Sequence, residues 1–207
     1  VWSPDGTRVA YSSDHDGHWD IYWKAADGSG DEEPILKGGS LLKYPSGWSP
    51  DGQTLIYEQI GQKTGWDICA ISSRGDRTSR SVLTSSFDEL NPRISADGRW
   101  MTYISNESGR PEVYVQAYPG PGAKHQISMS GGVFPKWRSD GREIIFITNN
   151  GASLVEFNPE RGQGIGNPRT VQPPDGIVGG DTTPDPRRWL VLTEADGSNI
   201  SDDLTIV

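Results

Sequence analysis

The sequence has few of the features that would narrow its function at once. It contains a single cysteine, so no internal disulfide can form, and Cys69 lies in an apolar run where a small core residue is expected. No stretch approaches the roughly 18 apolar residues that a membrane-spanning helix needs. Basic residues are outnumbered and scattered, giving a net charge of −9, so a nucleic-acid partner is not expected.

Apolar residues are also scarce, at 33% of the chain, and no helical periodicity is sustained over about ten residues. The sequence is rich instead in turn formers and large rings, with 26 Gly, 15 Pro and 8 Trp. Gly and Pro set the dihedral angles of tight turns, and Trp buries a large area per residue. This composition favours many short strands joined by tight turns and excludes a helical bundle.

One short motif, Trp-Ser-Pro-Asp-Gly in its clearest copies, recurs along the chain. Its copies lie near residues 3–6, 49–52, 95–98, 138–141 and 183–186. Their aspartates are 43 to 46 residues apart and are Asp5, Asp51, Asp97, Asp140 and Asp185. Glycine follows in four copies, as Gly6, Gly52, Gly98 and Gly141, and Pro186 replaces it in the last. This period is typical of β-propellers and also of helical HEAT repeats.

The content of each period decides between these folds. In the second copy, three strand-length apolar runs follow the turn, at 55–57, 67–71 and 81–83. The segment leading into each turn supplies a fourth strand, with a residue such as Trp48 at its end, packed between blades. Four short strands per period predict propeller blades, each burying its faces against its neighbours. The final run, 204–207, is expected to be a strand of the fifth copy.

We therefore predict an all-β fold, a β-propeller of four-stranded antiparallel blades, with residues 1–207 as a single partial domain. About five blades are present, and an incomplete ring would leave strand edges exposed, so a parent ring of roughly six to eight blades is expected. A self-contained five-bladed ring is the alternative. The repeat aspartates and glycines have a structural explanation, because Asp bonds to the backbone two residues on and Gly accepts positive φ.

The repeats resemble the TolB-type WD40-like (PD40) propeller family, whose signature is a Trp/Phe-Ser-Pro-Asp-Gly turn, a strand ending in Tyr and an Asp/Glu-Ile/Val-Tyr strand. Residues 2–22 match it almost position by position, 48–71 nearly as well, and 94–115 with Ala96 in place of Pro. The resemblance implies a propeller, with a periplasmic or other extracytoplasmic location. Similar repeats occur in TolB and in the propeller that gates prolyl-oligopeptidase-type peptidases.

A closer likeness concerns residues 105–116, 119–122 and 134–143. Their sequences are similar to those of the propellers that follow the kinase domain and membrane span of bacterial, notably acidobacterial, Ser/Thr protein kinases. This resemblance implies a parent kinase but not a kinase activity of the segment itself.

A search for catalytic motifs finds none. The Gly-x-Ser-x-Gly elbow, a kinase catalytic loop, a phosphate loop followed by Lys and the zincin motif are absent. The three histidines, His15, His18 and His125, are tied to no nucleophile by motif. We predict that this segment is not an enzyme and needs no cofactor.

The most suggestive polar cluster is the hairpin at 14–20. There Asp14, Asp16 and Asp20 are weak candidates for binding Ca²⁺ or a transition metal. The same hairpin is a plain polar turn in other repeats, so a solvated hairpin is the favoured interpretation. Two loop-like stretches, 38–45 and 162–168, break the strand pattern, and they are either blade linkers or binding loops.

The leading hypothesis is a non-catalytic, TolB-like module that binds or senses a protein, peptide or small ligand through the face or channel of the ring. One alternative makes it the C-terminal extracytoplasmic sensor region of a transmembrane Ser/Thr protein kinase, enzymatic only through an upstream domain. Another makes it the gating propeller of a prolyl-oligopeptidase-type peptidase, which requires a hydrolase domain with a Gly-x-Ser-x-Gly motif downstream.

Overall fold

The computed structural model describes the chain except residues 16, 40–41, 159–164, 172–176, 183–188 and 194–207. The described part is built from antiparallel strands and contains no helix. The strands form three four-stranded sheets, one three-stranded sheet and one two-stranded sheet. The predicted all-β fold of propeller blades is therefore confirmed.

Each sheet takes consecutive strands and is one blade. Blade 1 contains β1 (Arg8–Ser13), β2 (Asp20–Ala25) and β3 (Glu33–Leu36). Blade 2 contains β4 (Lys43–Trp48), β5 (Thr54–Ile60), β6 (Trp66–Ser72) and β7 (Ser79–Leu83). Blade 3 contains β8 (Glu89–Ile94), β9 (Trp100–Ser105), β10 (Glu112–Ala117) and β11 (Lys124–Gln126). Blade 4 contains β12 (Val133–Trp137), β13 (Glu143–Thr148), β14 (Gly151–Glu156) and β15 (Arg169–Val171).

The remaining described strands, β16 (Ile177–Thr182) and β17 (Trp189–Thr193), pair with each other. Blade 1 differs from the four-stranded prediction, because its first strand is represented in the described chain only by a single bridge between Trp2 and Val9.

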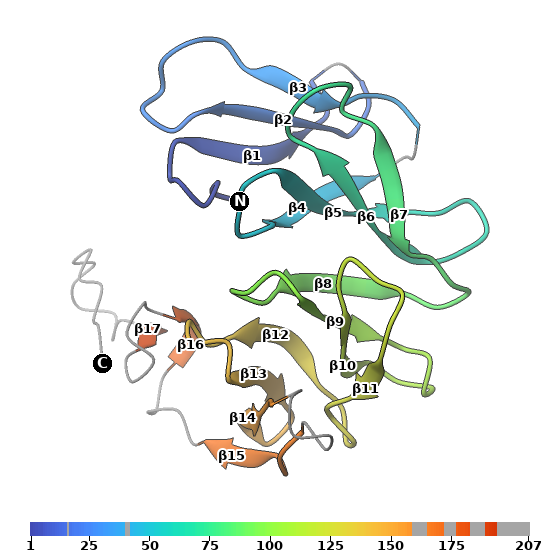
Figure 1. The fold of residues 1–207 in the computed structure, drawn as a ribbon, viewed down its shortest axis with the longest axis vertical. Helices are drawn as coiled ribbons and strands as arrows, with labels where there is room; N and C mark the ends of the chain where they lie inside the picture. Colours follow the sequence, from blue (N-terminus) through green and yellow to red (C-terminus); the bar gives the residue numbers. More distant parts are fainter. Residues whose placement is uncertain (16, 40–41, 159–164, 172–176, 183–188, 194–207) are drawn as a thin grey trace.

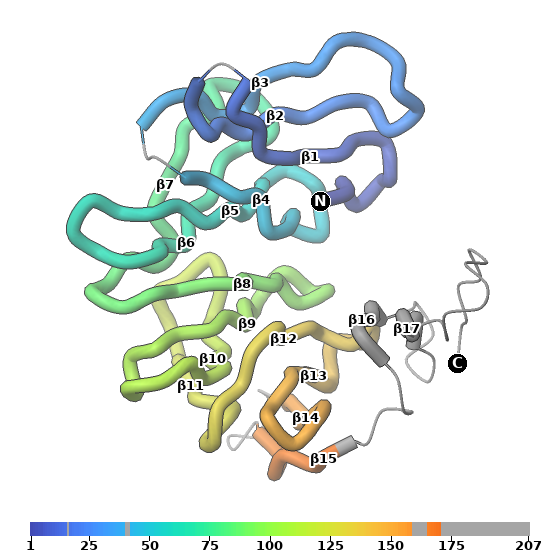
Figure 2. The backbone as a smooth tube through the Cα atoms, turned by 180° about the vertical axis from the view of Figure 1, so that it is seen from behind, coloured from blue at the N-terminus to red at the C-terminus, as the bar shows by residue number. Residues whose placement is uncertain are grey.

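The blades follow one another in chain order, from β1–β3 at one end of the arc to β12–β15 at the other (Figure 1). The view from behind shows the same succession, with β8 crossing the middle (Figure 2). First strands meet between blades, since β8 contacts both β4 and β12. Each of these first strands has an irregular pairing with its second strand at the same place, such as that between Leu90 and Arg93. Such bulges bend a strand and sharpen its twist.

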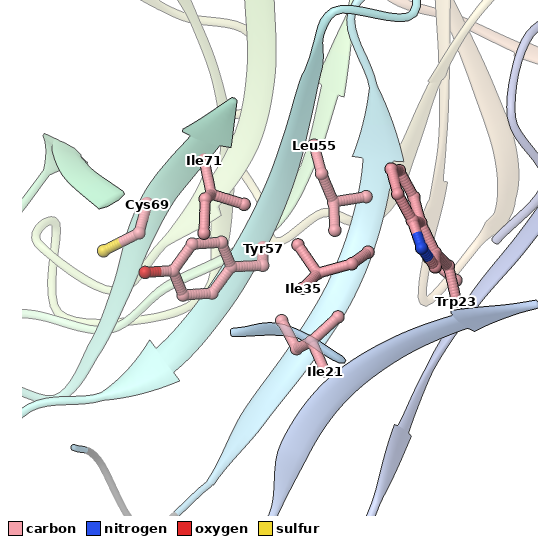
Figure 3. Close-up of a cluster of buried hydrophobic side chains, with 8 residues drawn as sticks. Ile21, Trp23, Ile35, Leu55, Tyr57, Cys69 and Ile71 are labelled. Carbon is pink, nitrogen blue, oxygen red and sulfur yellow. The ribbon is translucent and has the colours of Figure 1, made fainter. Parts of the chain in front are cut away.

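The hydrophobic core lies between blades, because alternate residues of a strand point to opposite faces of its sheet. Figure 3 shows the junction of blades 1 and 2, which we call junction 1/2 and name the others likewise. Ile21, Trp23 and Ile35 of blade 1 pack there against Leu55, Tyr57, Cys69 and Ile71 of blade 2. Cys69 is 2% exposed, and burial raises the pKa of its thiol to about 11.

The other junctions are built in the same way. Junction 2/3 packs Ile56, Ile68 and Ala70 against Met101, Tyr103 and Tyr114. Junction 3/4 packs residues of β10 against β13 and β14, together with Trp137, which ends β12. Trp137 is 8% exposed, and its indole Nε1 donates a hydrogen bond to the Arg93 carbonyl of blade 3 at 2.9 Å. The aromatic residue before the turn therefore packs between blades, as the sequence predicts.

The repeat turns join the first and second strands. Gly6 N donates to the Ser3 carbonyl at 2.9 Å, and Gly6 has a φ of 69°, in the left-handed region that favours glycine. Asp5 Oδ1 accepts from the Thr7 backbone N–H at 3.0 Å. Asp51, Asp97 and Asp140 accept the same backbone bond in their own copies.

The structure corrects one sequence-based expectation and does not describe the residues of two others. The segment 38–45 is interpreted as loop-like, but β4 already begins at Lys43, because Lys43 and Tyr44 pair with Gln59 and Glu58 of β5. The fifth repeat turn with Asp185, and the predicted strand at 204–207, lie outside the described residues.

Candidate functional site

Each blade presents two ends to its surroundings. We call the end that carries the repeat turn the turn side. The opposite end is the link side, where the second strand turns into the third and the chain passes to the next blade. Neighbouring blades contact each other repeatedly there. Trp66 N donates to Asp88 Oδ1 at 3.0 Å, and Gly132 N donates to the Pro111 carbonyl at 3.1 Å.

Exposed large apolar side chains gather on the link side. Beyond Val1 and Trp2, those found among the described side chains are Tyr44, Phe87, Met129, Phe134 and Ile147. All five lie in a link, near the start of a first strand or near the end of a second strand. Single exposed apolar residues are ordinary, and Trp2 is exposed beside the first repeat turn, but five such residues at the link side of several blades are typical of a partner-binding surface. We call these five the link-side apolar set.

Phe134 differs most from an ordinary surface residue. Its side chain is 60% exposed, and its φ is 53°. A left-handed backbone is rare for a bulky residue and costs about 1–3 kcal/mol. Asn91, which also precedes a proline in its first strand, has the same φ of 53° but tolerates it better, because its short side chain can bond locally. The fold therefore holds the Phe134 ring toward solvent at an energetic cost.

Aromatic rings continue this surface across junction 1/2. The Tyr44 ring centroid lies 6.1 Å from that of Trp19 and 5.7 Å from that of Trp66. Tyr44 is 39% exposed, and the other two rings are partly buried. Rigid rings of this kind supply a large contact area at a low cost in conformational entropy.

An acidic residue of blade 1 anchors the link into blade 2. Asp20 Oδ1 accepts from Lys43 Nζ at 2.9 Å and from Gly38 N at 2.9 Å, and both donors belong to the chain entering blade 2. Lys43 Nζ also donates to the Trp19 carbonyl at 2.8 Å. The Asp20 and Lys43 side chains are 4% and 1% exposed, so they form a buried ion pair.

Glu112 does the same for the link into blade 4. It accepts from Ser128 Oγ, from Gly131 N at 2.9 Å and from Arg110 Nε at 2.6 Å. Burial acts to raise the pKa of Glu112, but these three hydrogen bonds outweigh it and the pKa is lowered. The acid of the Asp/Glu-Ile/Val-Tyr signature thus holds the next blade. Sequence reasoning missed this role, although an acid recurs at the start of the third strand in blades 1, 2 and 3 and was a signal for it.

The turn side carries polar clefts between neighbouring blades. The cleft at junction 1/2 has a volume of about 600 Å³ and gathers Arg8, Arg74 and Arg77 beside Trp23. The guanidinium carbons of Arg8 and Arg77 lie 4.0 and 4.9 Å from the Trp23 ring centroid. The indole donates to Glu33 at 3.0 Å, and hydrogen bonds from Trp23 and then Arg77 lower the pKa of Glu33. The charged and aromatic side chains that line this cleft therefore already bind one another.

The cleft at junction 3/4 has a volume of about 660 Å³ and is also charge-paired. Arg99 bonds Asp97 at 2.8 Å, and Glu143 pairs with Arg138 at 3.2 Å and Arg169 at 2.8 Å. The turn side therefore offers salt-bridged polar walls, in contrast to the exposed rings of the link side.

The weak metal candidates Asp14, Asp16 and Asp20 lie in and beside the hairpin between β1 and β2. Asp14 is exposed, Asp20 is buried against Lys43, and Asp16 lies outside the described residues. Within the part of the chain that the structure describes, no group of three or more His, Cys, Asp or Glu side chains could hold a metal ion.

The fold brings Ser13, His15 and Glu32 together in an arrangement that resembles a catalytic triad. His15 Nδ1 lies 2.8 Å from Ser13 Oγ, and His15 Nε2 lies 3.2 Å from Glu32 Oε1. A Ser–His–acid order is that of nucleophilic hydrolases. However, the His15 and Glu32 side chains are 42% and 38% exposed, and Glu32 also accepts from the Tyr11 hydroxyl. Since Ser13 and His15 belong to one turn facing water, a polar hairpin network explains the contacts.

The order of the sheets and the cores between them define the class of protein, a β-propeller. TolB from Acinetobacter baumannii has a TM-score of 0.72 at 18% identity, covering 94% of this chain and 49% of its own. A protein assigned as TolB from Agrobacterium tumefaciens has a TM-score of 0.66 at 24% identity, covering 82% of this chain and 62% of its own. The fold is therefore that of TolB-like propellers.

Enzymes share this fold. A puromycin-hydrolysing peptidase of Mycobacterium tuberculosis has a TM-score of 0.63 at 16% identity, covering 93% of this chain and 34% of its own. An oligogalacturonate lyase in complex with manganese has a TM-score of 0.65 at 14% identity, covering 96% of this chain and 58% of its own.

In sequence, an uncharacterized protein of Agrobacterium fabrum is 27% identical over 148 residues, which are 70% of this chain and 49% of that protein. No protein-family model matches the chain. The chain spans between 34% and 62% of the length of these similar proteins. Among its described residues, no helix has the length and apolar character needed to cross a membrane.

Proposed function

We propose that this chain is a non-catalytic, TolB-like recognition module that binds a protein or peptide through its link side. The observation that carries the proposal is Phe134, a 60% exposed ring on a left-handed backbone. Backbone strain persists where the surrounding fold over-determines it, and it is common at binding sites. The rest of the link-side apolar set extends the same surface.

The spread of this set favours a macromolecular partner over a small ligand. Its members belong to blade 2, to the link into blade 3, to the link into blade 4 and to blade 4 itself. A surface of that extent suits an extended peptide or a protein face. The net charge of −9 adds long-range attraction for a partner with basic residues.

Selection from a random peptide library displayed on phage, using the full chain as bait, tests the proposal. The selected peptides are expected to combine apolar and basic residues. The double variant F87S/F134S should weaken their binding about tenfold or more, as measured by fluorescence anisotropy. The matched control is R99A/R142A on the turn side, which should bind as the unchanged chain does. Peptides that bind F87S/F134S unchanged would contradict the proposed surface.

The non-catalytic part of the proposal has its own test at Ser13, His15 and Glu32. Ester hydrolysis, followed with p-nitrophenyl acetate, is expected to proceed at the same rate with the unchanged chain and with S13A. Turnover that S13A abolishes would overturn it, because only a nucleophilic role of Ser13 depends on that hydroxyl.

We further propose that residues 1–207 act as one propeller domain of a longer protein in an extracytoplasmic compartment. The likeness to TolB and the greater length of the similar proteins support this. An alkaline phosphatase fusion to the parent protein, active only outside the cytoplasm, tests the location. The attachment of a kinase or peptidase domain, and the blade number of the ring, stay predictions from the sequence.

A further inference from the structure

Junction 2/3 departs from the pattern by which an acid anchors the next blade. Asp67 precedes Ile68 in β6 as Asp20 precedes Ile21 in β2. Glu89, however, starts β8 where Lys43 starts β4. The strands β6 and β8 are in contact. At these two positions junction 1/2 has a carboxylate and an ammonium, whereas junction 2/3 has two carboxylates, and the charge of Asp67 acts on Glu89.

Each of these carboxylates keeps one buried oxygen without a partner. Glu89 is 1% exposed; one of its oxygens accepts from the Ser85 hydroxyl, and Oε2 has no hydrogen-bond partner. Asp67 is 5% exposed; Oδ2 accepts from Thr64 Oγ1 at 2.8 Å, and Oδ1 has no partner. Buried carboxylate oxygens without donors are costly, so each calls for a positive charge.

The other charges of the junction are already engaged. Asp88 accepts from Trp66 N at 3.0 Å and from Asn106 Nδ2 at 2.8 Å. Glu107 is paired with Lys124. Within the described chain, no Lys or Arg forms an ion pair with Asp67 or Glu89. Lys124 lies close enough to act on Glu89 through its charge, but its ammonium is ion-paired with Glu107 and forms no ion pair with Glu89.

We propose that Asp67 Oδ1 and Glu89 Oε2 bind a hard divalent cation of the Ca²⁺ type, in the position that the Lys43 ammonium takes at junction 1/2. A glutamate Oε and a lysine Cε are the same number of bonds from Cα. The lysine Nζ lies one bond further out. A Ca²⁺ ion about 2.3–2.6 Å beyond that oxygen falls near the equivalent of the Lys43 nitrogen. The Thr64 and Ser85 hydroxyls and water would complete an oxygen shell.

Calcium suits this donor set better than other common metals. All the candidate donors are oxygens, which hard cations prefer, and two positive charges offset two carboxylates. Mg²⁺ demands near-ideal octahedral geometry and loses its water reluctantly, so a pair of carboxylates on two different strands fits it less well. The proposed site is independent of the peptide-binding surface.

The test uses the full chain, stripped with EDTA and titrated with CaCl₂ by calorimetry and by thermal unfolding. One ion per chain is expected to bind and to raise the unfolding temperature. E89Q and D67N should each weaken binding about tenfold or more. E89K, which supplies its own ammonium, should unfold at a higher temperature than the calcium-free unchanged chain and should no longer respond to calcium.

The matched control is E58Q. Glu58 is also a buried carboxylate of blade 2, but its Oε1 already accepts from Ser46 Oγ and Asn91 N. E58Q should keep the calcium response. The absence of saturable binding at millimolar calcium, or a response that survives both E89Q and D67N, would overturn the site.

Discussion

Junctions 1/2 and 2/3 use the same two backbone positions and opposite chemistry. Asp20 is ion-paired with the Lys43 ammonium in one, and in the other Asp67 acts on the Glu89 carboxylate through its like charge. The apolar faces beneath them are equally well buried. Apolar packing between sheets therefore carries the blade geometry, while the polar residues at the link side are free to change. We expect them to set local stability rather than the fold.

The largest expected effect is at Lys43. K43M removes the ammonium and leaves Asp20 buried without its charge partner, which costs about 3–5 kcal/mol of unfolding free energy. Urea unfolding followed by tryptophan fluorescence measures this. The control is K63M, at an exposed lysine in the hairpin between β5 and β6. It should change the unfolding free energy by less than about 0.5 kcal/mol. A loss at K43M no greater than in that control would remove the distinction between the two junctions.

The second effect concerns the anchor of junction 3/4. E112Q keeps the shape of the side chain but loses the charge that accepts from Ser128, Gly131 and Arg110. Because hydrogen bonds to a charged group contribute about 1.5–3 kcal/mol each, a net loss of about 2 kcal/mol is expected. The same urea experiment measures it, with E156Q at an exposed glutamate as the control. Equal stability of the two variants would contradict an anchoring role.

The third prediction contrasts the pH dependence of two acids without calcium. Burial, and then the charges of Asp67 and Glu107, raise the pKa of Glu89 from 4.5 against the opposing Ser85 hydrogen bond and Lys124 charge. The folded state then holds its proton more tightly than the unfolded state. Its contribution to stability is greatest below 4.5 and falls as the pH rises toward the raised pKa.

The contribution of Glu112 to stability changes with pH in the opposite direction. Its lowered pKa gives stability that is present above 4.5 and is lost as the pH falls. Unfolding free energies measured at closely spaced pH values should therefore diverge from the unchanged chain in opposite directions for E89Q and E112Q. The expected size is about 1.4 kcal/mol for each pH unit between the folded and unfolded pKa values. Parallel profiles for the two variants would contradict the assignment.

The smallest effect separates two tryptophans at equivalent places. Trp137 Nε1 donates to the Arg93 carbonyl at 2.9 Å, whereas Trp48 Nε1 is buried without a partner. W137F loses a hydrogen bond and W48F removes an unsatisfied donor, so W137F should be less stable by about 1 kcal/mol. Thermal unfolding of the two variants side by side measures the difference, and the reverse order would count against the contrast.

The sequence predicts the fold well, because the evidence for it is local and repeated. The turn motif and the apolar runs after it recur in every copy, so errors in one blade are corrected by the others. The candidate site depends on residues far apart in the chain. Nothing local indicates that Glu32 reaches His15, or that Lys43, of a type usually exposed, is 1% exposed.

Residues with a special backbone were equally hidden. Phe134 lies in an apolar stretch that suggests burial, and only the bulge in β12 gives it a φ of 53° and an exposed ring. Comparing copies of the repeat was the one route to the link-side anchors. The acids at 20, 67 and 112 align, and the change from Lys43 to Glu89 is visible once they do.

The anchors also bear on how such a chain can grow by gene duplication. Asp20 lies in blade 1, whereas its donors Lys43 and Gly38 belong to the chain entering blade 2. An acid and its donors therefore span the boundary between two sheets. A duplicated segment whose ends fall in the repeat turns copies the acid together with its donors. One whose ends fall in the links instead joins an acid to donors from another repeat. Crossovers in the repeat turns therefore keep each acid with the donors that it already has.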